Sequence, residues 1–315
     1  MAIHDRSYSR WKGDRSLPVT TVPIIAAAGI RAATTAFFKR KVPAMLLTLA
    51  AFSMFLFGIV FIFLRYYVQA NLDAMPQDFA DGILDEDFVT FTSASGLTLF
   101  VYLANVQIFF AGLACVLMGS GQVANDRRTN ALEMYLSRPV TVGHYVIGKF
   151  GAVVFFVSLV TLLPALVLVL AQLTVSFGDP AEVARMLDLA WRTAAAGAVL
   201  ASIPTLLVLM ASSLVQKARN AAILWFGLLF LTDVVAAQTL REAFGDERFL
   251  LMSVVFNVRQ VMAWLLQPPV EFLSEIAPDV MTGVPPSQSA LVLGGWVVLS
   301  LVVLLRRVRP VEVVG

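Results

Sequence analysis

Long uncharged apolar runs alternate with short polar segments along most of the chain. A helix needs about 20 apolar residues to cross the roughly 30 Å hydrocarbon core of a bilayer. Six runs approach or exceed this length, at 42–64, 97–119, 151–177, 193–215, 221–240 and 290–305. Only the fifth contains a charged residue, Asp233. The pattern predicts an all-α integral membrane protein with six transmembrane helices.

Composition supports this interpretation, and the charge distribution adds an orientation. Hydrophobic residues make up 59% of the 315 positions and charged residues only 14%, unlike a soluble domain. If the N-terminus is cytoplasmic, 17 of the 23 Lys and Arg residues lie on the inner side. Basic residues near the span ends set the orientation of a membrane protein. Both termini are therefore predicted to be cytoplasmic, flanking a six-span membrane domain at 42–305 with a short basic tail at 306–315.

Residues 1–41 are predicted to form a cytoplasmic N-terminal tail followed by an interfacial helix. Ser, Gly and basic residues at the start indicate a flexible tail. Residues 24–41 are apolar and then basic, which suits a helix on the inner leaflet with Lys39, Arg40 and Lys41 at anionic headgroups. A basic flank that only fixes the topology explains the same residues.

The segment 249–266 is a rival seventh span, apolar apart from four polar residues. Ser253, Asn257 and Gln260 recur at helical spacing and share one face, while Arg259 lies off that face. This pattern favours an outer amphipathic or re-entrant helix between spans five and six. Counting it as a span would instead place the C-terminal arginines outside.

The residues needed for covalent chemistry or metal binding are missing. No Gly-rich phosphate-binding motif occurs, and the two histidines, His4 and His144, lie in polar segments. The single cysteine, Cys115, excludes an intrachain disulfide and is predicted to be a packing residue in the second span. The sequence therefore predicts no catalytic residues and no metal site.

Residues 125–150 form a charged island between the second and third predicted spans. Asn130 is predicted to cap a short helix with Glu133 at its third position, and Pro139 to end it. Leu132, Tyr135 and Leu136 form an apolar stripe on that helix, and Thr141 is predicted to cap the next turn. A helix this short needs a packing surface. That surface is either the lipid headgroups or a groove in a cytoplasmic partner.

The island resembles the motif that links the second and third spans in permease subunits of type-2 ABC exporters. The matching residues are Asp126, Arg127, Arg128, Thr129, Asn130, Ala131, Leu132, Glu133, Leu136, Ser137, Arg138, Pro139, Tyr145, Gly148 and Lys149. The basic C-terminal tail is similar as well. Asn130-Ala131 departs from the Gly-Thr that many members carry at this point.

The resemblance implies a membrane permease of an ATP-driven exporter in the plasma or inner membrane. Two permease subunits, identical or related, would pair, and each would dock on a separate ABC ATP-binding subunit that carries the ATP. The chain itself would bind no cofactor and hydrolyse no ATP. Its coupling residues would be Asp126, Arg127, Arg128, Asn130, Leu132, Glu133, Tyr135, Leu136, Ser137, Arg138 and Pro139.

Two other function classes and two roles for Asp233 remain open from the sequence. A secondary transporter usually shows repeated halves and several buried ionisable groups, whereas here Asp233 is the only one inside a span. A non-transporting membrane anchor or assembly subunit is the third class.

Asp233 is a candidate for the translocation path, and the alternative is a structural role near the headgroups or beside Arg65 or Arg241.

Overall fold

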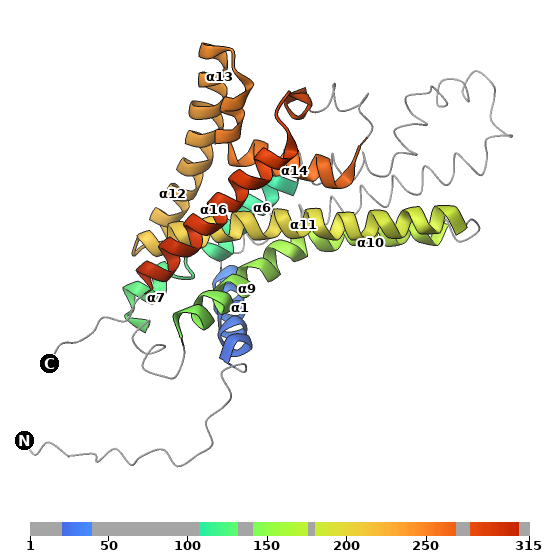
Figure 1. Cartoon of the computed structure of the whole chain (residues 1–315). Helices are drawn as coiled ribbons and strands as arrows, with labels where there is room; N and C mark the ends of the chain where they lie inside the picture. Colours follow the sequence, from blue (N-terminus) through green and yellow to red (C-terminus); the bar gives the residue numbers. More distant parts are fainter. Residues whose placement is uncertain (1–20, 40–106, 132–140, 176–179, 269–277, 309–315) are drawn as a thin grey trace, which may run out of the picture.

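The computed structural model describes residues 21–39, 107–131, 141–175, 180–268 and 278–308, all of them helical or in connecting turns (Figure 1). No strand occurs in these segments. The first predicted span, 42–64, lies outside the described residues. The elements, with the labels of Figure 1, are α1 (Thr21–Lys39), α6 (Ile108–Ala114), η4 (Cys115–Gly119), α7 (Ala124–Arg128), α9 (Val142–Val160), α10 (Leu162–Val175), α11 (Pro180–Leu214), α12 (Ala218–Phe230), η5 (Leu231–Gln238), α13 (Thr239–Phe244), η6 (Glu247–Met252), α14 (Val254–Leu266), η7 (Pro278–Met281) and α16 (Pro286–Arg307).

Five helical stretches of the described segments are long and apolar enough to cross a membrane. They are Ile108–Arg128, Val142–Val160, Val183–Leu214, Ala218–Phe244 and Pro286–Arg307. Each overlaps one of the predicted spans that follow the first. The protein is therefore a multi-pass, helical membrane protein.

The third predicted span is not one continuous helix. The helix breaks at Thr161, which separates α9 from α10. Pro164 explains the position of the break, because proline lacks an N–H and its ring collides with the carbonyl four residues earlier, at Val160. The uncharged apolar run at 151–177 predicted one span here. Pro204, by contrast, lies inside α11 without interrupting it.

Helix α11 is the centre of the packed core. It contacts α9, α10, α12, α14 and α16. Leu200, Leu207 and Leu209 on this helix are among the largest fully buried side chains. Neighbouring helices approach closely at small residues, as in other membrane bundles. A Cβ added at Gly119 would lie only 2.5 Å from Cγ1 of Val208 on α11.

Helix α14 contains most of the segment 249–266, which the sequence offered as an alternative seventh span. With 13 residues it is about 20 Å long, too short to cross a bilayer. Its predicted polar face is turned into the protein, where Ser253, Asn257 and Gln260 are buried. Asn257 Nδ2 donates to the carbonyl of Leu251 at 2.7 Å, and Gln260 Nε2 donates to that of Val284 at 2.9 Å. The polar face is only partly satisfied inside the protein, because Asn257 Oδ1 and Gln260 Oε1 are buried and accept no hydrogen bond from the described residues. The position of α14 relative to the membrane stays a prediction.

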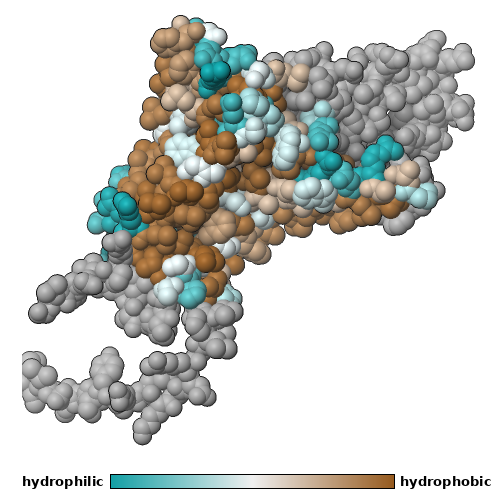
Figure 2. Space-filling model, viewed as in Figure 1, coloured by the Kyte–Doolittle hydropathy of each residue, from teal (hydrophilic) through white to brown (hydrophobic). Residues whose placement is uncertain are grey.

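The long helices diverge from one end of the molecule. In Figure 1, α7, the beginning of α12 and the end of α16 lie together at this end, and α13 lies at the far end of α12. The basic residues Arg127, Arg128, Arg219, Arg306 and Arg307 belong to these three helix ends. Figure 2 shows hydrophilic atoms at this end and a mostly hydrophobic surface along the helices. We refer to it below as the basic end.

Candidate functional site

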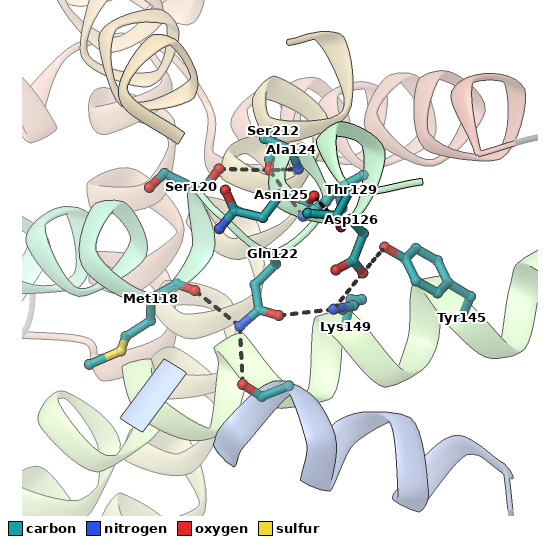
Figure 3. A network of polar contacts seen from close by, with 12 residues as sticks. Met118, Ser120, Gln122, Ala124, Asn125, Asp126, Thr129, Tyr145, Lys149 and Ser212 are labelled. Carbon is teal, nitrogen blue, oxygen red and sulfur yellow. Dashed lines mark hydrogen bonds and ion pairs between the residues drawn. The ribbon is translucent and has the colours of Figure 1, made fainter. Parts of the chain in front are cut away.

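The two ends of the charged island are joined by a buried ion pair. Asp126 belongs to α7, which opens the island, and Lys149 belongs to α9, which closes it. Lys149 Nζ lies 2.8 Å from Asp126 Oδ2, with side-chain exposures of 6% and 17% (Figure 3). A charge at this depth requires a partner, because burial strips it of water. The pair therefore holds the helices on both sides of the island in one arrangement.

A tyrosine and a glutamine complete the surroundings of this pair. The Tyr145 hydroxyl donates to the same carboxylate oxygen at 2.8 Å, and the tyrosine ring lies 5.6 Å from Lys149 Nζ. Lys149 also donates to Gln122 Oε1 at 3.4 Å. Tyr145, Lys149 and Gln122 are all buried. We call Asp126, Lys149, Tyr145 and Gln122 the clamp.

The clamp extends to the N-terminal helix α1. Gln122 Nε2 donates to the carbonyl of Met118 at 3.2 Å and to that of Gly29 on α1 at 3.4 Å (Figure 3). Helix α1 also packs closely on α9, since a Cβ at Gly148 would lie 2.6 Å from Ile25 Cγ2. The predicted N-terminal helix is present at 21–39 and packs against the island, and its position at the membrane interface stays a prediction.

A serine on α11 connects the clamp to the core. The chain leaves the helical ladder between η4 and α7, so backbone groups there need other partners. Ser212 Oγ donates to the Ser120 carbonyl at 2.8 Å and accepts from the Ala124 amide at 2.9 Å and the Val123 amide at 3.2 Å. Arg127 donates to the carbonyl of Ser213. The start of the island is therefore fixed to the central helix α11.

The other coupling residues predicted from the sequence fall into two groups. Arg128 and Asn130 are exposed at the end of α7. Asn130 has a φ of +54°, a left-handed conformation at the position after the C-cap Thr129. This backbone differs from the extended conformation typical of an N-cap. Residue 131 is helical, so Asn130 lies directly before the predicted short helix, and its role as the cap of that helix stays a prediction. Leu132, Glu133, Tyr135, Leu136, Ser137, Arg138 and Pro139 lie outside the described residues.

The predicted cap at Thr141 is confirmed. The Thr141 side chain accepts a hydrogen bond from the His144 amide at 3.3 Å, and Thr141 is the N-cap residue of α9. Cys115 is buried among core side chains, as predicted for a packing residue.

Sequence reasoning missed two members of the site. Neither Gln122 nor Ser212 is among the coupling residues predicted from the sequence. A glutamine one turn before the island's first acidic residue was a local signal for Gln122. No local pattern identified Ser212, which is 92 residues from Ser120.

Asp233 lies far from the clamp along α12 and η5. It sits in the π-helix η5 and accepts a hydrogen bond from Ser253 Oγ, which precedes α14. It lines a pocket together with Arg241, Glu242 and Arg259. The alternative partner Arg65 is outside the described residues, whereas Arg241 lines the same pocket. Asp233 thus contributes to a polar contact between η5 and the start of α14.

The family comparison agrees with this architecture. Residues 62–305 match the model of the ABC-2 family transporter protein, which is well over half of the chain. No curated protein matches the chain. The chain belongs to the ABC-2 transporter family and is a membrane permease of an ABC transporter. Membership in this family implies an ABC ATP-binding subunit as a partner.

Proposed function

We propose that this ABC-2 family member is the membrane-spanning permease subunit of an ATP-driven exporter and that the island couples it to a separate ATP-binding subunit. The observation that carries the proposal is the buried Asp126–Lys149 pair at 2.8 Å. It ties together the two helices from which the island emerges. A segment that receives force needs such a rigid base, because a loosely held loop would move without moving the spans.

The contacts of the clamp offer two routes for this force. Through Arg127 and Ser212, the start of the island is attached to α11, the central helix of the core. Through Lys149 and Tyr145, it is attached to α9. Closure of two ATP-binding subunits would push on the island, and the attached helices would move as units between two packed arrangements.

The family and the charge pattern support the remaining parts of the proposal. Two permease subunits, identical or related, pair in the plasma or inner membrane. Six spans place both termini in the cytoplasm, on the same side as the island. ATP is bound and hydrolysed on the partner, and this chain carries no catalytic residue.

The decisive experiment is to co-express the chain with ABC ATP-binding subunits and purify the complex. The test variant replaces Leu132, Tyr135 and Leu136 by alanine. Each buried apolar anchor at such an interface typically contributes about 2 kcal/mol, roughly 30-fold in affinity. We expect the wild-type chain to retain a stoichiometric ATP-binding subunit and the triple variant to lose it or to lose transport-coupled ATP hydrolysis.

A matched control replaces three exposed apolar residues elsewhere in the chain, Phe244, Met252 and Met281, by alanine. These residues belong to α13, η6 and η7 and are not part of the island. The control variant should retain the ATP-binding subunit. If the triple variant binds its partner as the wild-type chain does, the island is only an anchor to lipid and the coupling proposal is wrong.

A further inference from the structure

A groove at the basic end lies between α1 and α12, with the turns after η4 as its floor. Its volume is about 490 Å³, in the range of small-molecule sites. Ala32 and Ala33 of α1 form one side, and Ala218 and Ala222 of α12 form the other. These small side chains on opposing helices leave the space between the helices open.

The two ends of the groove differ in chemistry. Val116, Leu117 and Met118 of η4 give one end an apolar wall that is part of a membrane-spanning helix. Gln122, Asn125 and Arg219 line the other end. An apolar wall that leads to a polar, cationic end is complementary to an amphiphile with an anionic head.

The charge at the polar end is positive once the clamp is taken into account. Asp126 and Lys149 both border the groove, but they neutralise each other at 2.8 Å. Arg219 is exposed and forms no ion pair with any acid in the segments that the structure describes. It lies in the first turn of the 13-residue helix α12, whose N-cap Lys217 provides no side-chain cap. The positive end of the helix dipole therefore adds to the Arg219 charge.

The position of the groove identifies the source of the amphiphile. The span that contains α12 is mostly unburied within the protein, and Ile223 and Leu224, next to the groove residue Ala222, are exposed. Exposed apolar side chains on a helix of membrane-spanning length are available for contact with lipid. A whole phospholipid is larger than the groove, so the groove would hold the headgroup and the first part of one acyl chain, with the remainder in the bilayer.

We propose that this groove binds one anionic phospholipid from the leaflet at the basic end, with its phosphate at Arg219 and the start of α12. The proposal does not depend on the ATP-driven mechanism, since it requires only the folded chain in lipid. The bound lipid would touch Gln122 and Asp126 of the clamp as well as α1 and α12. The packing of the clamp, from which the island emerges, would therefore depend on how much anionic lipid the membrane contains.

The test is native mass spectrometry of the full-length purified chain with dioleoyl phosphatidylglycerol or dioleoyl phosphatidylcholine added. We expect one retained phosphatidylglycerol and weaker binding of phosphatidylcholine. Arg219→Gln should lower the affinity for phosphatidylglycerol about fivefold, as for one cation at a membrane surface. Lys217→Gln is the matched control, because Lys217 is exposed, two residues away and not part of the groove, and it should change the affinity less than twofold.

A second variant tests the groove itself. Ala222→Phe should fill the space and displace phosphatidylglycerol, and its thermal midpoint should match that of the wild-type chain. Equal binding of the two lipids, or equal weakening by Arg219→Gln and Lys217→Gln, would show non-specific attraction to the basic end and overturn the proposal. Displacement of phosphatidylglycerol by millimolar inorganic phosphate would also overturn it, because the site would then recognise a free anion.

Discussion

Lys149 is a buried cation in a largely apolar protein, and its charge is balanced by Asp126. Removal of one partner from a buried ion pair leaves an uncompensated charge and usually costs 3 kcal/mol or more. We therefore expect Lys149→Met to lower the free energy of unfolding by about 3 kcal/mol. The measurement is reversible unfolding in mixed micelles.

The double variant Asp126→Asn with Lys149→Met should recover at least half of this loss, because neither charge is then left buried alone. The control is Asp188→Asn, which breaks the more exposed pair with Arg192 on α11 and should cost less than about 1 kcal/mol. If Asp188→Asn lowered the free energy of unfolding as much as Lys149→Met does, the Asp126–Lys149 pair would contribute no more to stability than an exposed ion pair.

At the scale of the element, the contact between α1 and α9 depends on a missing side chain. In a solvent-exposed helix, Gly→Ala is stabilising by up to about 1 kcal/mol. At Gly148, however, the new Cβ would lie 2.7 Å from Ile25 Cβ, which is rigidly attached to the α1 backbone. We expect Gly148→Ala to destabilise the protein and to separate α1 from α9, measured as faster proteolysis of the N-terminal helix.

The neighbouring glycine of the same helix provides the control. A Cβ at Gly151 would lie 3.9 Å from Ala26 Cβ, an ordinary contact, so Gly151→Ala should be neutral or stabilising. Adding Ile25→Gly to Gly148→Ala removes the Cβ that the new methyl group would meet, and it should restore the contact between α1 and α9 and part of the protection of α1. Unchanged proteolysis of Gly148→Ala would mean that α1 does not pack on α9 in this way.

At the scale of the whole molecule, the arrangement of helix ends predicts which residues share a side of the membrane. Arg128, at the basic end, and Arg248, in η6, are both exposed. In a chain with Cys115 replaced by Ala, we expect Arg128→Cys to react with a membrane-impermeant thiol reagent only from the cytoplasmic side. Arg248→Cys should react only from the outer side. Labelling of both from one side of sealed vesicles would contradict the predicted topology.

The helical membrane class was determined by the sequence alone, because crossing a bilayer requires a property of consecutive residues. An uncharged run of about 20 residues is a local feature, and so are the cap at Thr141 and the polar face shared by Ser253, Asn257 and Gln260. The motif residues Asp126, Tyr145 and Lys149 were also visible in the sequence. Their grouping at the two ends of one island was enough to mark it as the candidate site.

Only the tertiary structure decided what these residues contact. Periodicity specifies which side chains share a helix face, but it does not specify the neighbouring helix. Asp126 was predicted as a coupling residue for a partner, and the fold places it against Lys149 and Tyr145 of the same chain. The polar face of α14 could have met water, but the fold turns it inward, where the side-chain nitrogens of Asn257 and Gln260 donate to backbone carbonyls. Ser212 became part of the site because the chain brings α11 back beside η4 about 90 residues later, a proximity that no local pattern contains.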